Sequence, residues 1–321
     1  MSSISVNTIT DASGGSTTSI NGFTPTVSNM AGRNRIINGG MVFDQRNNGA
    51  AQTISAGTTP YTVDRWLAYA SGANATSQQV TGTGAFSNAL RFTGAASNTD
   101  VLVLQRIESK NVSDFSGATI VVQVYLWGSA AGTVVWGVDY ANATDNFSAI
   151  TSVATGSISI TTTPTLYTFT VAALPSNVTN GIQVKFDFGA LASGVTRTIT
   201  GVQLEEGSVA TPFEHRQYGQ ELALCQRYFE TFVNATIQGI FYDGYSSITG
   251  QSMGINMPYK VTKRASPTIT SVGSWSTSNT SGSLTFNAGV ESFFAFYGSA
   301  SSGRVYWYNQ ANSGFTASAE L

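Results

Sequence analysis

The sequence predicts a mainly β protein made of an extended N-terminal arm, an antiparallel jelly-roll sandwich, one connecting helix and a smaller C-terminal β-sandwich. Most of the chain consists of short runs in which apolar and polar residues alternate, and Gly, Asn and Ser separate these runs. One run has apolar residues at intervals of three and four instead. The boundaries that follow are residues 1–35 for the arm, 36–216 for the jelly roll, 217–233 for the helix and 234–321 for the C-terminal β domain.

The composition is typical of a protein with true hydrophobic cores and a weakly charged surface. Its 321 residues suffice for about two domains. Hydrophobic residues make up 41%, charged residues only 10%, and the net charge is −2. Such a chain is not expected to bind nucleic acid, which requires clustered Lys and Arg. The densest basic cluster, Lys260–Arg264, is interpreted as a solvated strand end.

Cysteine usage and hydropathy exclude two further features. Cys225 is the single cysteine, so no intrachain disulfide can form, and its apolar neighbours indicate a small buried side chain. The N-terminus lacks a basic stretch followed by an apolar run, and no apolar span reaches the length of about 18 residues that a membrane helix needs. We therefore expect neither a signal peptide nor insertion into a membrane.

The first segment, residues 1–35, is rich in Ser, Thr, Gly and Asn and poor in large apolar side chains. It buries too little apolar surface to fold by itself. The segment is either a flexible tail, or an arm that becomes ordered when it packs against another protein or against copies of itself.

The second segment contains β-patterned runs without an intervening helical period, which indicates an antiparallel sandwich of the jelly-roll type. Val122–Leu126 and Val134–Val138 alternate cleanly and predict a hairpin of two adjacent strands. The runs are Met41–Arg46, Arg65–Ala70, Ala89–Thr93, Val101–Ile107, Thr119–Gly128, Thr133–Tyr140, Leu166–Val171, Ile182–Phe188 and Thr196–Leu204.

The last of these runs has two distinct faces. Period-2 alternation places Thr198, Thr200, Val202 and Leu204 on one face, and Ile199, Gly201 and Gln203 on the other.

A helix is expected over residues 217–233. Its apolar face consists of Leu222, Cys225, Phe229 and Phe232, which are spaced three, four and three residues apart. The face can pack within the monomer, or against the matching helices of neighbouring chains in a short trimeric bundle, because the segment spans too few heptads to decide. Residues 234–321 then resume the β pattern and suffice for a second, smaller sandwich.

Several stretches resemble bacteriophage fibre and tail proteins. TITGVQLEEGSVATPFEHRQYGQELALCQRYF (198–229) is similar to a segment that closes a carbohydrate-binding-module-like jelly roll in that group. AGRNRIINGGMVFDQRNNGA (31–50) with YTVDRW (61–66), and MPYKVTKRASPTIT (257–270) with FTASAEL (315–321), resemble the same group. The resemblance implies a homotrimeric fibre of the virion, assembled in the host cytoplasm, on either tail or head, and anchored to other virion proteins through residues 1–35.

Residues suited to catalysis are few. His215 is the single histidine, and without a second His or a Cys nearby a metal site is not expected. No serine lies in a G-x-S-x-G context. Glu205 and Glu206 are adjacent, so on a strand they point to opposite faces and cannot flank a glycosidic bond. We expect no catalytic residue, no metal, no cofactor and no enzymatic activity.

Glycan binding requires fewer specialised residues than catalysis. It needs an exposed aromatic ring that stacks on the apolar face of a sugar, and polar side chains that bind the sugar hydroxyls. The jelly-roll candidates are Trp136, Asp139 and Tyr140, with Trp127 as a further aromatic. Because Trp and Tyr on strands are more often core residues, each candidate has a structural alternative.

The C-terminal candidates are Tyr242 and Tyr245, together with the consecutive residues Tyr306, Trp307 and Tyr308. Three consecutive aromatics on one strand cannot all face inward, so at least one must face solvent or another chain.

These observations predict a virion fibre protein that adheres to host surface glycans. Two alternatives stay open: a capsid decoration or cement protein that binds no receptor, and a tailspike enzyme that degrades glycans. The sequence contains no repeat of the long β-helical kind that such tailspikes resemble.

Overall fold

The computed structural model describes residues 32–321, which divide into two compact units. Unit 1 comprises the described residues up to Val42, Gly49–His215 and Leu321, and unit 2 comprises Phe43–Asn48 and Arg216–Glu320. All but the last four residues of the expected arm, 1–35, lie outside the described part of the chain.

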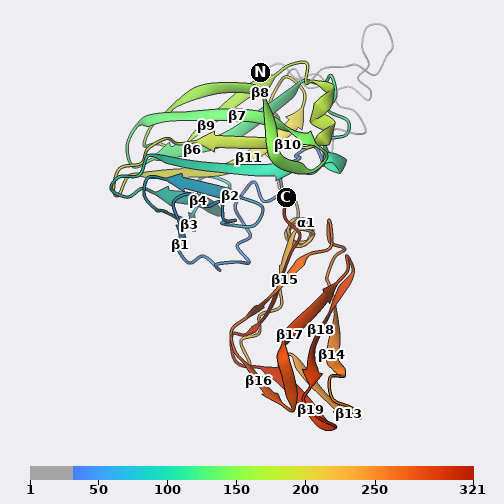
Figure 1. The fold of residues 1–321 in the computed structure, drawn as a ribbon. Helices are drawn as coiled ribbons and strands as arrows, with labels where there is room; N and C mark the ends of the chain where they lie inside the picture. Colours follow the sequence, from blue (N-terminus) through green and yellow to red (C-terminus); the bar gives the residue numbers. More distant parts are fainter. Residues whose placement is uncertain (1–31) are drawn as a thin grey trace, which may run out of the picture. The chain divides into compact units, whose positions relative to one another are not determined.

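Unit 1 is built from two antiparallel sheets (Figure 1). The six-stranded sheet has the order β1-β3-β4-β11-β6-β9, and the five-stranded sheet the order β2-β5-β10-β7-β8. The strands are β1 Gln52–Ile54, β2 Leu67–Ser71, β3 Ala75–Thr81, β4 Asn88–Thr93, β5 Asp100–Ile107, β6 Ile120–Gly128, β7 Gly132–Ala143, β8 Asn146–Ile160, β9 Thr165–Val171, β10 Ile182–Asp187 and β11 Thr196–Glu206. Two 3₁₀ turns, Ser109–Asn111 and Ser176–Asn180, complete the unit.

The two sheets enclose one hydrophobic core, to which both contribute every second residue. Leu90, Val124 and Ile199 enter it from the six-stranded sheet, and Val103 and Phe186 from the five-stranded sheet. This alternation confirms the expected β-sandwich.

The expected hairpin of Val122–Leu126 with Val134–Val138 is wrong. β6 pairs with β11 and β9, whereas β7 pairs with β10 and β8, so the chain crosses from one sheet to the other between them. Clean alternation predicted two half-buried strands correctly. It could not tell strands that share a sheet from strands that face each other across a core.

Other differences from the predicted strands have local causes. Met41–Arg46 forms no strand, because Asn38 and Met41 have positive φ and the Met41 amide closes a turn onto the Asn38 carbonyl. β3 and β8 were not predicted. Their sequences, ATSQQVT and NFSAITSVATGSISI, are mostly Ser, Thr, Ala and Gln and carry little hydrophobic pattern.

A β-bulge divides β11 into two halves. The pairing of β11 with β6 shifts register between Thr200 and Gln203, and Gly201 there has φ of +60°. Before the bulge Ile199 points into the core, and after it Val202 and Leu204 do. The expectation that Thr198, Thr200, Val202 and Leu204 share a face is therefore wrong, because the extra residue reverses the alternation.

Beyond the bulge, the outward face of β11 is covered by a polar network. The buried Glu205 carboxylate accepts hydrogen bonds from the Thr211 amide and hydroxyl, both at 2.7 Å, and forms an ion pair with Arg33. Gln203 accepts a hydrogen bond from the Glu214 amide at 2.8 Å. The polar residues of this half of the strand are thus satisfied by chain segments that lie over them.

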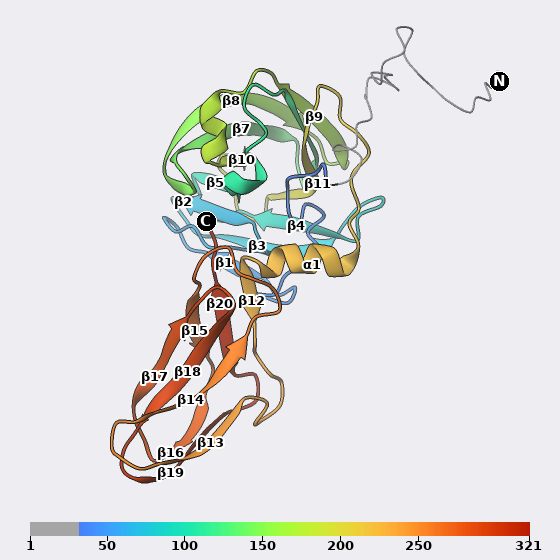
Figure 2. The same ribbon diagram turned by 90° about the vertical axis from the view of Figure 1, so that its right-hand side faces the viewer.

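Unit 2 is a smaller sandwich of three-stranded ladders in two layers. One layer contains β14-β18-β17, which lie side by side in Figure 2. The other contains the ladders β12-β20-β15 and β13-β19-β16. Their central strands, β19 and β20, follow each other in the sequence and are separated by a break. The strands are β12 Phe229–Thr231, β13 Phe241–Ser246, β14 Ser252–Pro258, β15 Thr268–Val272, β16 Trp275–Ser278, β17 Thr280–Ala288, β18 Ser292–Ser299, β19 Gly303–Asn309 and β20 Gly314–Ser318.

One buried amide holds together the break between β19 and β20. The side chain of Asn309 is fully buried, accepts a hydrogen bond from the Ile240 amide at 2.7 Å, and donates to the Thr236, Gln310 and Ser313 carbonyls. Backbone groups that the interrupted ladder leaves unpaired find their partner there.

The single α-helix of the described residues is shorter than expected. α1 spans Tyr218–Gln226, so Leu222 and Cys225 lie on it, whereas Phe229 lies on β12 and Phe232 packs in the core of unit 2. The expected helix 217–233 is wrong in its second half, because aromatic and β-branched residues there pair with β20 instead. No helix in residues 32–321 is long and apolar enough to cross a membrane.

A buried ion pair lies beneath β12. The Lys263 ammonium is 2.6 Å from the Glu230 carboxylate, both side chains are 0% exposed, and the cation lies over the Tyr259 ring. Burial lowers the pKa of Lys263, and the hydrogen bond that the Lys263 ammonium donates to the Glu230 carboxylate opposes this shift. Interpreting Lys260–Arg264 as a solvated strand end was therefore wrong for Lys263, because spacing alone does not reveal a buried counter-ion.

Replacing Glu230 by Gln should destabilise unit 2 by about 3 kcal/mol, because it leaves the buried Lys263 without its counter-charge. Urea unfolding measures the change in free energy. Asp243→Asn is the matched control: it breaks the exposed pair of Asp243 with Arg304 and should change stability little. Equal effects of the two substitutions would show that burial does not decide the strength of these pairs.

Two carboxyl groups meet on the five-stranded sheet of unit 1. Burial, together with the hydrogen bond and charge of Asp187, raises the pKa of Asp100 from 3.8 to about 6. The native state therefore holds this proton more strongly than the unfolded chain. The resulting stabilisation is complete below pH 3.8 and is lost as pH rises through about 6.

Asp100→Asn should abolish this loss of stability. The stability of the variant relative to the parent protein should therefore increase as pH rises from about 4 to about 7. One pKa unit corresponds to about 1.4 kcal/mol, but the carboxyl is partly exposed, so we expect a gain of about 1 kcal/mol. Denaturant unfolding at several pH values measures it, with the exposed Glu206→Gln as control. If the free energy of unfolding depended on pH in the same way in Asp100→Asn and in the parent protein, the raised pKa of Asp100 would be contradicted.

Candidate functional site

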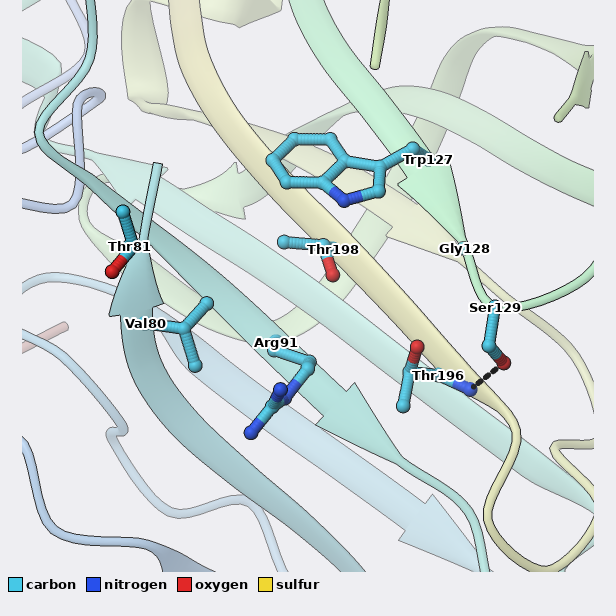
Figure 3. A pocket seen from close by; sticks show the side chains of 8 residues that line it. All are labelled: Val80, Thr81, Arg91, Trp127, Gly128, Ser129, Thr196 and Thr198. Atoms are coloured by element: carbon cyan, nitrogen blue, oxygen red, sulfur yellow. Dashed lines mark hydrogen bonds between the residues drawn. The ribbon is translucent and has the colours of Figure 1, made fainter. Parts of the chain in front are cut away.

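A hollow of about 430 Å³ lies on the face of the six-stranded sheet that points away from the core. It crosses four neighbouring strands, β3, β4, β11 and β6 (Figure 3). We call it the groove. Its lining consists of Val80, Thr81, Arg91, Trp127, Gly128, Ser129, Thr196 and Thr198.

The centre of the groove is one cross-strand row. Thr198 on β11 is paired with Arg91 on β4 and with Trp127 on β6, so the three side chains lie on the same face. Figure 3 shows the indole on one side of Thr198 and the guanidinium on the other. The row continues to Gln78 on β3, whose amide oxygen accepts a hydrogen bond from Arg91 at 3.1 Å.

One end of the groove is formed by the loop between β6 and β7. Ser129 in this loop accepts a hydrogen bond from the Thr196 amide at 2.9 Å. The buried Arg197 guanidinium donates to the carbonyls of Ala130 and Thr196 at 3.1 and 3.0 Å, and its burial lowers its pKa. Arg197 thus fixes the loop that carries Ser129.

Gly128 must be a glycine for this loop to approach β11. A Cβ at Gly128 would lie 2.6 Å from the Thr196 carbonyl oxygen and 2.7 Å from an Arg197 nitrogen. The wall of the groove therefore depends on a missing side chain as well as on Trp127.

The lining chemistry suits a ligand with hydroxyl groups and an apolar ring face. The half-buried Trp127 offers an aromatic surface, and Arg91, Thr196 and Ser129 offer donors and acceptors, whereas Thr198 is buried and forms the lining between Trp127 and Arg91. None of the eight lining residues is Asp or Glu, so the groove lacks the two carboxyl groups that glycoside hydrolysis ordinarily uses.

The jelly-roll candidates predicted from sequence do not form one site. Trp136 points inward and stacks on Phe169 of β9 at 3.8 Å, and Tyr140 also packs against the core. Asp139 lies on the opposite face of β7, 1% exposed, where it binds Lys185 at 2.9 Å and Gln183 at 3.0 Å. The alternation of β7 separates Asp139 from the other two residues, and it packs the partly buried Trp136 and Tyr140 against the core.

In unit 2 the structure separates the predicted aromatics by the same rule. Trp307 is 0% exposed, stacks on Tyr242 at 6.0 Å and donates its indole N–H to the Met253 carbonyl. Trp307 belongs to the core of unit 2, and the partly buried Tyr242 packs against that core. Trp307 is therefore not available to a ligand.

Tyr245, Tyr306 and Tyr308 lie on the outward face of the β13-β19-β16 ladder. Tyr245 is 73% exposed, and the rings of Tyr306 and Tyr308 are parallel with centroids 6.4 Å apart. Arg304 lies beside Tyr306 and makes a bidentate pair with Asp243 at 2.9 and 2.6 Å. The expectation that at least one of residues 306–308 faces outward is met by the first and the third.

Sequence reasoning singled out Trp127 but missed the rest of the groove. The signal available was the polar alternation Thr196, Thr198, Thr200, which marks an outward face on a strand whose other face is apolar. Arg91 gave no such signal, because only strand pairing brings it beside Thr198.

Metal ligands do not gather in the described residues. No group of three or more His, Cys, Asp or Glu side chains that could hold a metal ion occurs in residues 32–321. His215 packs against Phe86 and Phe213 with ring centroids 5.5 and 4.9 Å away, beside the covered half of β11.

No protein-family model matches the chain, and no curated protein matches it. Among solved structures, it is similar to the N-terminal cellulose-binding domain of β-1,4-glucanase C from Cellulomonas fimi, with 22% identity, a TM-score of 0.32, and coverage of 46% of this chain and 90% of that one. It is also similar to a family 11 carbohydrate-binding module from Clostridium thermocellum in complex with a β-1,3-1,4-mixed-linked tetrasaccharide, with 11% identity, a TM-score of 0.32, and coverage of 50% and 98%.

A third similar structure is the enzymatically active domain of tailspike protein 4 from bacteriophage CBA120. The identity is 14%, the TM-score 0.35, and the match covers 54% of this chain and 21% of that one. At such identities and TM-scores, none of these similarities carries a conclusion about what the present chain binds.

Proposed function

We propose that the chain is a non-catalytic protein that binds carbohydrate through the groove of unit 1, and that it does so as a fibre of a bacteriophage virion adhering to host surface glycans. The observation that carries the first part is the cross-strand row in which Trp127, Thr198 and Arg91 face one hollow. An aromatic plane beside fixed hydrogen-bonding groups is the arrangement that sugar rings require.

The groove is shaped before any ligand arrives. Arg91 is held by Gln78, and the loop with Ser129 is held by Arg197. A ligand therefore need not order these groups, which lowers the entropic cost of binding. Because Arg91 supplies a positive charge and the lining has no carboxylate, the groove accepts neutral or acidic saccharides.

The second part of the proposal, a virion fibre, is supported by the resemblance of residues 31–50, 198–229 and 257–270 to phage fibre and tail segments. Several copies on one particle would compensate for weak binding at each single groove. Of the alternatives, a cement protein would need no open groove, and a tailspike hydrolase would need paired carboxylates.

Trp127→Ala should weaken saccharide binding at least about tenfold, because it removes the stacking surface, and Arg91→Ala should weaken it by a similar factor. A glycan array of bacterial surface polysaccharides first identifies a bound saccharide. Titration calorimetry with that saccharide then measures each variant.

Ile150→Ala is the matched control, since Ile150 is exposed on β8 of the other sheet and should leave affinity unchanged. Binding that survives both groove substitutions would exclude the groove as the site. An array without any bound saccharide would favour the cement protein.

The fibre predicts a trimer in solution. Sedimentation equilibrium of the full chain should give three times the chain mass of 33.7 kDa at micromolar concentration. A stable monomer that still binds saccharide would refute the fibre while leaving the groove intact.

A further inference from the structure

The outward face of the β14-β18-β17 sheet in unit 2 carries two aromatic rings. Phe294 and Phe296 are two residues apart on β18, both half-buried, and stack with ring centroids 5.2 Å apart at an interplanar angle of 22°. Their neighbours Phe293 and Ala295 point the other way, into the core. The outward pair therefore has no role in the core of unit 2 and forms a solvent-facing aromatic surface in which each ring covers one face of the other.

Two amide side chains flank this surface. Asn256 on β14 and Asn287 on β17 are the direct cross-strand partners of Phe294, so all three side chains share one face. Both asparagines are exposed, and neither side-chain amide has a hydrogen-bond partner among the described residues. One ring is thus bracketed by two free groups that can each donate and accept.

The surface is hollowed at Phe294. A depression of about 450 Å³ is lined by Phe294, by both asparagines and by the turn that ends at Glu291 and Ser292. The Glu291 carboxylate is held by the Thr262 hydroxyl at 2.9 and 3.1 Å. Beside the depression, Gly254 lies opposite Phe296, where a Cβ would come within 2.5 Å of the Cβ of Phe296.

The lining chemistry selects among possible occupants. None of the eight lining residues is Lys or Arg, so the depression offers nothing to a phosphate, a nucleic acid or an acidic polysaccharide. Free amides beside an aromatic plane suit a neutral ligand that has hydroxyl groups around an apolar ring face.

We infer that Phe294, Asn256 and Asn287 form a second carbohydrate site, which takes a neutral pyranose ring stacked on Phe294 with its hydroxyls bound by the two amides. Phe296 stacks on the Phe294 ring and so fixes its orientation. The site lies on unit 2 and does not depend on the groove of unit 1, so either can exist without the other.

Side-chain NMR of the full ¹⁵N-labelled chain tests this inference. The probes are linear hexaoses of β-1,4-glucose, β-1,4-galactose and α-1,4-glucose. At least one should shift the NH₂ signals of Asn256 and Asn287 together and saturably, and the shifts should persist in Trp127→Ala. Phe294→Ala should weaken this binding about tenfold.

Two further variants guard against a folding defect. The double substitution Asn256→Ala with Asn287→Ala alters only exposed side chains and should weaken binding by a similar factor. Because the two amide probes are then absent, binding is monitored through the backbone amide signals of β18. Tyr308→Ala, an aromatic truncation on the other sheet, should leave it unchanged.

Three results would overturn the second site: no shift of either amide with any hexaose at millimolar concentration, shifts that survive Phe294→Ala, or shifts that follow protein concentration without sugar. The last would show that a second copy of the chain covers Phe294 and Phe296. None of these results tests the groove of unit 1. The groove is tested separately, by the saccharide affinities of Trp127→Ala and Arg91→Ala.

Discussion

The bulge at Gly201 decides what the six-stranded sheet can do. Its positive φ inserts one extra residue into β11, so that Ile199 before it and Val202 after it both enter the core. The ring of Phe86 lies where a side chain at Gly201 would be, and it packs on Tyr125 and Phe213. One glycine therefore separates a half of the sheet that is covered by the chain from a half that stays open as the groove.

Charges inside this weakly charged protein have specific partners. Glu205 is held by Thr211 and Arg33, Asp139 by Lys185 and Gln183, and Glu230 by Lys263. Each carboxylate lies on a strand, and loss of its partners would leave a buried charge without compensation. The open surfaces, in contrast, offer mostly hydroxyls, amides and aromatic rings, which suits ligands recognised by hydrogen bonds and stacking.

In unit 2 the alternation of side chains along each strand divides the aromatic residues between core and surface. On β19, Trp307 enters the core while Tyr306 and Tyr308 face out, and on β18 Phe293 enters while Phe294 and Phe296 face out. Aromatic residues at successive strand positions cannot all be buried, so an aromatic-rich strand in a small sandwich necessarily presents rings to its surroundings. Such outward-facing rings can contribute to binding surfaces on the protein.

The sequence by itself determined the mainly β class, the succession of a larger sandwich, a helix and a smaller sandwich, and the outward position of at least one of residues 306–308, because alternation with a period of two is a local property. It also placed Thr198 and Thr200 on one face of β11. Tertiary structure decided which strands pair, where the bulge reverses alternation, where α1 ends, and which residues gather at the groove and around Phe294. Arg91 reaches Thr198, and Asn256 reaches Phe294, only through ladders between distant segments, and no local pattern encodes such pairing.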